Sequence, residues 1–295
     1  MVLVGERLRI DGPNGALDVE TSGPADGTVL VFHNGTPSAG QMFSEQVKAG
    51  ARRGLRHVTY SRPGYGGSDR HPGRSVADCA ADVAAIADVL GIERFFTAGI
   101  SGGGPHALAC TALLGDRVIA AATLGSVAPY DAEGLDWLDG MGQENLDEFG
   151  AVTAGEDALL AYLEPAREQL LAVTGEQLYT AFGALVSEPD RRALTGAFAQ
   201  FLADNVRTGL EAGVSGWLDD DIAFVRDWGF ALDAIRTPVT VWQGAQDRFV
   251  PAAHGEWLAA HVPGADARFE PEHGHLSLEL AAYGEILDAL LAQGT

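Results

Sequence analysis

The segment Gly99-Ile100-Ser101-Gly102-Gly103 places one serine among three glycines, at a point where a strand should turn into a helix. Residues 94–98 before it favour a strand, and residues 105–110 after it favour a helix. A serine at such a turn has a sharply bent, strained backbone that pushes its hydroxyl out of the sheet. Side chains two residues away on either side would clash there, which accounts for Gly99 and Gly103. The segment therefore predicts a strand–turn–helix unit with Ser101 exposed at its apex.

Strands and helices alternate along most of the chain. The apolar and β-branched runs predict strands at residues 7–10, 16–20, 28–32, 56–60, 95–99, 118–124, 238–243 and 267–270. Helical patterns fall at residues 38–53, 75–90, 105–115, 252–261 and 276–291. This alternation is typical of an α/β fold with a mostly parallel, doubly wound sheet.

The alternation breaks after Tyr130. From residue 131 to about residue 228 the apolar positions recur at helical spacing, with interruptions at Gly150, Gly175, Pro189 and Gly213. This pattern predicts four or five short helices. We therefore expect residues 1–130 and 236–295 to form the α/β core and residues 131–235 to form a helical cap inserted above it.

The predicted cap is strongly acidic. It holds 21 of the 41 acidic residues but only five of the 19 basic ones. We interpret these carboxylates mainly as a solvated face. The alternative is that one of them faces the pocket and attracts a cationic group, such as the amine of a substrate.

Composition excludes several function classes. The net charge of −22 disfavours nucleic acid as a partner, because phosphate binding needs clustered Lys and Arg. No apolar run is long enough to span a membrane, and the first residues do not resemble a secretion signal. Cys79 and Cys110, the two cysteines, are expected to be reduced and buried in a cytoplasmic protein. We expect a small-molecule substrate, no membrane partner, no metal and no organic cofactor; monomer and homo-oligomer both stay open.

Ser101 is the candidate nucleophile, and a serine hydroxyl needs a base to take its proton. His275 follows Gly274 at the start of the last helix, and His273 is the nearest competitor. Asp247 comes just after a buried strand and would hold the ring of the base histidine, with Asp131 as the alternative acid.

Backbone N–H groups should bind the oxyanion that forms when the serine attacks. The N–H of Gly102, directly after the serine, is one candidate. The N–H of Thr36, in the loop after strand 28–32, is the other. His33, at the start of that loop, is expected to have a structural role by hydrogen-bonding the loop.

These segments together resemble the α/β-hydrolase fold family, of the lipase, esterase and iminopeptidase type with a helical cap. The resemblance covers nearly the whole chain. It is carried by His33-Asn34-Gly35-Thr36-Pro37, Ser61-Arg62-Pro63-Gly64-Tyr65-Gly66-Gly67-Ser68, the serine turn, Gln243-Gly244-Ala245-Gln246-Asp247 and Gly274-His275. The order serine, acid, histidine is that of this family. The family pattern places the base directly after a glycine, which favours His275 over His273. The resemblance to this family implies a central sheet with helices on both faces.

The resemblance implies a serine hydrolase that cleaves carboxylic esters through an acyl-enzyme. Four alternatives use the same fold: a proline iminopeptidase-like aminopeptidase, a C–C bond hydrolase, a perhydrolase and a small-molecule receptor. Haloalkane dehalogenases and epoxide hydrolases are disfavoured, because they use Asp where this chain has Ser101.

Overall fold

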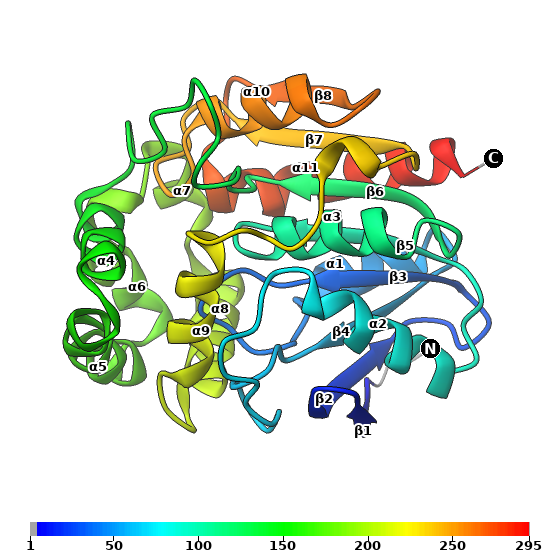
Figure 1. The fold of residues 1–295 in the computed structure, drawn as a ribbon, viewed down its shortest axis with the longest axis horizontal. Coiled ribbons are helices and arrows are strands. Elements are labelled where there is room, and N and C mark those ends of the chain that lie inside the picture. The colour runs from blue at the N-terminus through cyan, green and yellow to red at the C-terminus, as the bar shows by residue number, and fades with distance from the viewer. Residues whose placement is uncertain (1–4, 295) are drawn as a thin grey trace.

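The computed structural model describes residues 5–294 and contains an eight-stranded sheet (Figure 1). Its strand order is β1-β2-β4-β3-β5-β6-β7-β8. The strands are β1 Glu6–Gly12, β2 Gly15–Ser22, β3 Thr28–His33, β4 Leu55–Tyr60, β5 Phe95–Ile100, β6 Val118–Leu124, β7 Val239–Gly244 and β8 Asp266–Glu270. The pairs β1–β2 and β2–β4 are antiparallel and all other pairs are parallel. The predicted α/β class with a mostly parallel sheet is confirmed.

Helices cover both faces of the sheet. One face is packed against α1 (Ser44–Ala51) and α11 (His275–Gln293), and the other against α2 (Asp78–Val89), α3 (Gly103–Leu113) and α10 (Ala252–His261). Strand β3 shows why: Val29 and Val31 join one core, while Leu30 and Phe32 join the other. Successive side chains of a strand point to opposite faces, so a strand buried on both faces is apolar throughout.

A helical segment joins β6 to β7 and lies at the end of the sheet where β3, β5 and β7 finish (Figure 1). Its helices are α4 Gln143–Ala154, α5 Glu156–Ala172, α6 Leu178–Ala181, α7 Glu188–Ala193, α8 Gly196–Leu210 and α9 Ser215–Phe224. Short 3₁₀ turns lie at Gly175–Gln177, Gly183–Leu185 and Leu232–Ala234. The prediction of four or five short helices was wrong, because the segment contains six α-helices. The interruption expected at Gly150 falls instead at Gly155, where a φ of 115° ends α4; a single glycine such as Gly150 costs about 1 kcal/mol and does not by itself end a helix. The boundaries at residues 130 and 236 stay predictions.

The helix expected at residues 38–53 is shorter in the structure and begins only at Ser44. Residues before it form a loop held against β4. The side-chain amide of Asn34 donates to the carbonyls of Ala39 and Gln41, at 3.0 and 3.1 Å. A Cβ on Gly40 would lie 2.2 Å from the carbonyl carbon of Tyr60. These loop contacts replace the helical hydrogen bonds that the sequence pattern suggested.

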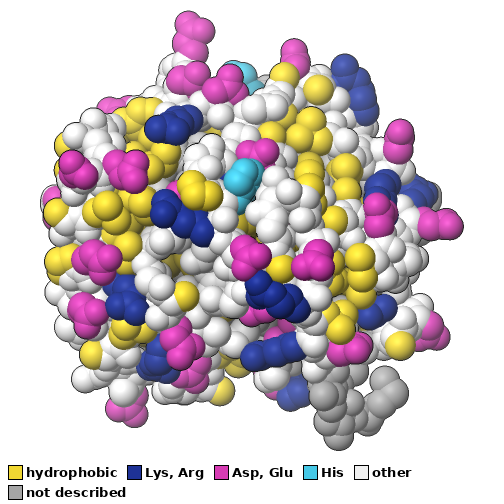
Figure 2. Space-filling model, turned by 60° about the horizontal axis from the view of Figure 1, so that its bottom comes forward, with side chains coloured by type: hydrophobic (Ala, Val, Ile, Leu, Met, Phe, Trp, Pro, Cys, Tyr) yellow, Lys and Arg dark blue, Asp and Glu magenta, His cyan; other side chains and the backbone are white. Residues whose placement is uncertain are grey.

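Charged side chains of both signs are interspersed with apolar ones on the face that Figure 2 shows. The acidic residues of the helical segment are not all solvated, however. Asp190, Asp219, Asp220 and Asp221 are each at most 5% exposed. The interpretation as a mainly solvated face does not hold for these four, whose side chains lie inside the protein.

Candidate active site

Ser101 sits at the junction of β5 and α3 with a φ of 55°, the only positive φ of a non-glycine residue among residues 5–294. Such a conformation costs about 1–3 kcal/mol and persists only where neighbours hold it. The N–H of Ser101 donates to the carbonyl of Leu124 at 2.9 Å, and its carbonyl accepts from Gly104 at 3.0 Å. The predicted strained turn is therefore present and is anchored to β6.

The glycines around Ser101 are required by close backbone contacts. A Cβ on Gly99 would lie 2.1 Å from the carbonyl oxygen of Gly103. A Cβ on Gly103 would lie 2.1 Å from the carbonyl oxygen of His33. Both contacts are far inside van der Waals distance, so the turn tolerates no side chain at either position.

Asp247 and His275 come together from two loops that follow β7 and β8. The Nδ1 atom of His275 lies 2.6 Å from Oδ2 of Asp247, and both side chains are buried. The other carboxylate oxygen accepts the N–H groups of Phe249 and Val250, at 2.9 and 2.8 Å. Because Asp247 accepts at Nδ1, the neutral ring carries its proton there, and Nε2 is left as the basic nitrogen.

Electrostatics raise the pKa of His275 above its ordinary value. Burial alone would lower this pKa, but the charge of Asp247 and the hydrogen bond to it outweigh burial. Burial raises the pKa of the Asp247 carboxyl, and the charge of His275 offsets part of that rise. The contact between His275 and Asp247 requires a glycine at position 125, because a Cβ there would lie 2.8 Å from Nδ1 of His275.

The alternative site residues lie elsewhere. His273 is partly exposed and takes part through its carbonyl, which accepts the N–H of Gln246 at 2.9 Å. Asp131 is exposed at the surface. The structure thus brings His275 rather than His273 to Asp247, and it does not bring Asp131 to either.

A buried aspartate of the helical segment anchors the backbone of His275. Asp190 of α7 accepts the N–H of His275 at 3.0 Å and the N–H of Ser277 at 2.8 Å. The hydroxyl of Ser277 donates to it as well, at 2.9 Å. These bonds satisfy N–H groups at the start of α11 that a helix leaves unpaired. The role of Asp190 could not be predicted from the sequence, because the two backbone N–H groups that it accepts lie 85 and 87 residues away.

The two predicted oxyanion donors lie beside the serine. A Cβ on Gly102 would lie 2.4 Å from Oγ1 of Thr36, and a Cβ on Gly35 would lie 3.3 Å from Cβ of Ser101. Within the described part of the chain, neither the N–H of Thr36 nor that of Gly102 donates to a protein group. Both are available to a bound oxygen atom.

An ion cluster that the sequence did not predict holds the loop of residues 34–36, which carries one of the predicted oxyanion donors. The guanidinium of Arg62 donates to the carbonyls of Asn34 and Gly35 and to Oγ1 of Thr36. Asp220 of α9 then binds Arg62 at 2.7 Å, Thr36 Oγ1 at 2.9 Å and Arg74 at 2.6 Å. Burial opposes the charge on Asp220, but the two guanidinium groups hold the pKa of its carboxyl well below the usual range.

Two buried histidines, His33 and His106, lie close to Ser101 in the core of the sheet and in α3. His33 does not bond the loop as expected; its ring nitrogens contact Tyr60 Oη at 3.2 Å and Thr97 Oγ1 at 3.1 Å, because the ring points into the core between strands. The Nδ1 atom of His106 donates to the carbonyl of Gly102 at 2.8 Å. Burial lowers the pKa of His106 to about 3, so this ring is neutral.

Two cavities meet at Ser101. The first, of about 180 Å³, we call the acid lobe; it is lined by Gly102, Glu148, Tyr162, Trp217, Asp221 and Phe224, among others. The second, of about 110 Å³, we call the apolar lobe; it is lined by Phe201, Leu202, Val206, His275 and Leu276, among others. Thr36, Ser101 and Phe249 line both. A substrate bound across Ser101 thus has a separate space for each of its halves.

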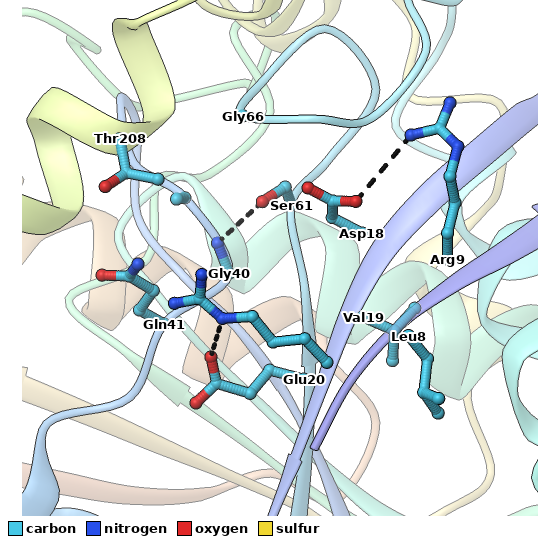
Figure 3. A pocket seen from close by; sticks show the side chains of 12 residues that line it. Leu8, Arg9, Asp18, Val19, Glu20, Gly40, Gln41, Ser61, Gly66 and Thr208 are labelled. Carbon is cyan, nitrogen blue, oxygen red and sulfur yellow. Dashed lines mark hydrogen bonds and ion pairs between the residues drawn. The ribbon is translucent and has the colours of Figure 1, made fainter. Parts of the chain in front are cut away.

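Figure 3 shows a further cavity, of about 250 Å³, on the outer side of the loop of residues 34–36. Neither Ser101 nor His275 lines it. Its charged side chains pair with one another: Arg7 with Glu20 at 3.3 Å, and Arg9 with Asp18 at 3.8 Å. We place the candidate site in the two lobes instead, where the reactive groups lie.

Residues 5–294 contain no group of three or more His, Cys, Asp or Glu side chains arranged to hold a metal ion. Within the same residues, no helix combines the length and the apolar character needed to cross a membrane. Cys79 and Cys110 are both buried and form no disulfide, and their sulfur atoms lie in hydrogen-bond contact at 4.0 Å.

The fold agrees with the comparisons to known proteins. A family model described as alpha/beta hydrolase fold matches residues 28–282. The chain therefore belongs to the α/β-hydrolase fold family. It is 28% identical, over 78% of each chain, to a bifunctional esterase/perhydrolase of Acinetobacter calcoaceticus.

Two further proteins illustrate the range of this similarity. A 2-hydroxy-6-oxononadienedioate/2-hydroxy-6-oxononatrienedioate hydrolase of Paraburkholderia phymatum is 27% identical, over 86% of this chain and 82% of that one. The crystal structure of the enol-lactonase from Burkholderia xenovorans superposes with a TM-score of 0.70 at 18% identity, over 97% of this chain and all of the other. The structural likeness concerns the fold alone.

Proposed function

We propose that this protein is a serine hydrolase that cleaves carboxylic esters of small molecules through an acyl-enzyme. One observation carries the proposal: Ser101 and His275 line the same cavity, and the Nδ1 atom of that histidine is bound to Asp247 at 2.6 Å. A nucleophile, a base and an orienting acid are the groups that acyl transfer needs. The helical segment from α4 to α9 acts as a cap in this proposal.

In the first half-reaction, Oγ of Ser101 attacks the ester carbonyl carbon while Nε2 of His275 takes its proton. The N–H groups of Gly102 and Thr36 bind the oxyanion of the tetrahedral intermediate. Asp247 stabilises the imidazolium, which then gives its proton to the leaving alcohol as the C–O bond breaks. Water repeats the sequence with His275 as base, releasing the carboxylic acid and restoring Ser101.

The charge of the two lobes favours an ester over the dianionic substrates named for some relatives. The substrate of the Paraburkholderia relative is, by its name, a dioate. No Lys or Arg appears among the described residues that line either lobe, whereas Glu148, Asp221 and Glu279 do. Two substrate carboxylates would lie near these acids without a cation to pair with.

A substrate panel tests the proposal. It contains p-nitrophenyl esters of increasing acyl length together with prolyl and alanyl p-nitroanilides. We expect turnover of the esters, with a maximum at short or medium chains because each lobe is small. Turnover of the anilides alone would replace the ester hydrolase with the aminopeptidase alternative. No turnover by folded protein would contradict both.

The pH dependence of ester turnover follows from the raised pKa of His275. Only the neutral ring can act as base, so kcat/KM should fall as the pH drops through this pKa. Because Asp247 raises the pKa above its ordinary value of about 6.5, we expect the half-maximal rate above that pH. In Asp247→Asn the charge is lost, so the acid limb should move to lower pH. A wild-type profile that stays flat to pH 5 would contradict this assignment of the base.

A further inference from the structure

Two carboxyl groups face each other on the wall of the acid lobe. Glu148 comes from α4 and Asp221 from α9, and both line this lobe closely enough for each carboxyl to influence the pKa of the other. Asp221 is 1% exposed, and its Oδ2 atom receives no hydrogen bond from any N–H or hydroxyl group of the described residues. The indole N–H of Trp217 donates to Oε1 of Glu148 at 2.7 Å. The pair is therefore poorly satisfied for groups this deeply placed.

The other buried aspartates of the helical segment show what a structural role looks like. Asp190 accepts bonds from the backbones of His275 and Ser277, and Asp220 binds two arginines. Glu148 and Asp221 have no such partner, and no Lys or Arg lines their lobe. A buried charge without a partner usually destabilises a protein, so its presence in a cavity indicates a ligand.

The charge state of the pair follows from its geometry. Two neighbouring buried carboxyls disfavour ionising together, so we expect the pair to share one proton. Burial and this mutual contact raise the pKa of Asp221 well above its usual range, and burial raises the pKa of Glu148. With one proton shared, the pair presents one negative charge to the lobe, and the carboxylate of Glu144 also lines it.

Aromatic rings surround this charge. Tyr162, Trp217, Phe224 and Phe149 line the acid lobe together with the carboxyl pair. The face of an aromatic ring attracts a cation, most strongly when both are removed from water. A carboxyl pair within aromatic walls matches the chemistry of an ammonium group.

We propose that the acid lobe binds an ammonium group carried by the acyl part of the substrate, with Glu148 and Asp221 as its binding residues. This inference rests on the proposed ester hydrolase function. The assignment to the acyl part comes from the lining of the lobes. His275 lines the apolar lobe and must reach the leaving oxygen, so the alcohol lies there. Gly102, the oxyanion donor, lines the acid lobe, which leaves that lobe for the acyl chain.

Matched esters test the inference. The first is a p-nitrophenyl ester whose acyl chain ends in a trimethylammonium group; the second ends in the neutral isostere, a tert-butyl group. Three spacer lengths sample the depth of the lobe. We expect wild type to prefer the cationic ester by about tenfold or more in kcat/KM, since one desolvated charge–cation contact contributes about 1–2 kcal/mol.

Variants of the pair should remove this preference. In Glu148→Gln and in Asp221→Asn, kcat/KM for the cationic ester should fall more than kcat/KM for the neutral ester, so that the preference for the cation is lost. Asp147→Asn, an exposed neighbour on α4, is the matched control and should behave as wild type. Each carboxyl is replaced singly, so that a folding defect in one variant leaves the other to decide.

The outcomes separate this inference from the proposed function. Equal rates for the two esters in wild type, or a preference that survives in both variants, would overturn the ammonium site while leaving the ester hydrolase intact. A preference only when the cation is on the alcohol part would overturn the assignment of the lobes. If no ester is hydrolysed, the proposed function fails, and binding of tetramethylammonium is followed by Trp217 fluorescence. Saturable binding that Glu148→Gln abolishes would support the site; no binding to wild type would overturn it.

Discussion

Replacing Ser101 with alanine should reduce kcat for p-nitrophenyl ester hydrolysis by about 10⁴- to 10⁶-fold. The variant loses the only atom that can form the acyl-enzyme. The N–H groups of Gly102 and Thr36 stay in place and leave a small residual rate above that of water. The substitution removes one oxygen atom, and alanine adopts the positive φ of this position about as readily as serine, so the folded state is retained. Rates are measured with active-site concentration fixed by protein mass.

A matched serine variant controls for nonspecific effects. Ser44 is exposed at the start of α1, away from both lobes, and Ser44→Ala should keep the wild-type rate. Unchanged circular dichroism and melting temperature confirm that Ser101→Ala is folded. A Ser101→Ala protein that retains more than a few per cent of the wild-type rate would show that another residue is the nucleophile.

Replacing Asp220 with alanine should have the largest effect on stability. Asp220 is fully buried and neutralises Arg62 and Arg74, which are themselves buried. Removing one member of a buried ion cluster leaves an uncompensated charge, at a cost of about 3–5 kcal/mol in the free energy of unfolding. The same change removes the carboxylate that binds both Arg62 and Oγ1 of Thr36, so the loop around Thr36 is held less firmly and kcat should fall in whatever fraction stays folded.

The exposed pair of Arg53 and Asp288 offers the matched control for Asp220. It has the same bidentate geometry, with distances of 2.7 and 2.8 Å, but the Asp288 side chain is 62% exposed. Exposed pairs contribute at most about 1 kcal/mol, so Asp288→Ala should change stability little. Chemical denaturation of both variants measures the difference. Equal effects of the two substitutions would contradict the role given to the buried cluster.

The parts of the fold that the sequence predicted are those with strong local patterns. Strand β3 is a run of apolar residues, and the Ser101 turn is marked by its glycines. Both signals lie within about ten residues, so they can be recognised without knowing the rest of the fold. The loop before α1 could not be recognised from a local pattern. The side-chain amide of Asn34 holds it by a bond to the carbonyl of Ala39, and Gly40 packs closely against the backbone of Tyr60, which is distant in the sequence.

The site residues also separate into those with a local sequence signal and those defined by contacts between distant parts of the chain. Ser101, Asp247 and His275 could be proposed from their positions after strands and glycines. The roles of Arg62 and Asp220 could not, because the two residues lie 158 positions apart. The one local signal was the run Asp219-Asp220-Asp221 within an otherwise apolar helix. Such a run indicates buried charge but does not say which residue meets a cation and which meets the pocket.

Trapping the acyl-enzyme tests the central claim most directly. The protein is mixed with excess p-nitrophenyl ester, quenched in acid during turnover and analysed by mass spectrometry of the intact chain and its peptides. We predict an added acyl mass on the peptide that contains Ser101, present in wild type and absent from Ser101→Ala. An acyl group on another residue, or rapid hydrolysis with no adduct and an undiminished rate in Ser101→Ala, would contradict the mechanism.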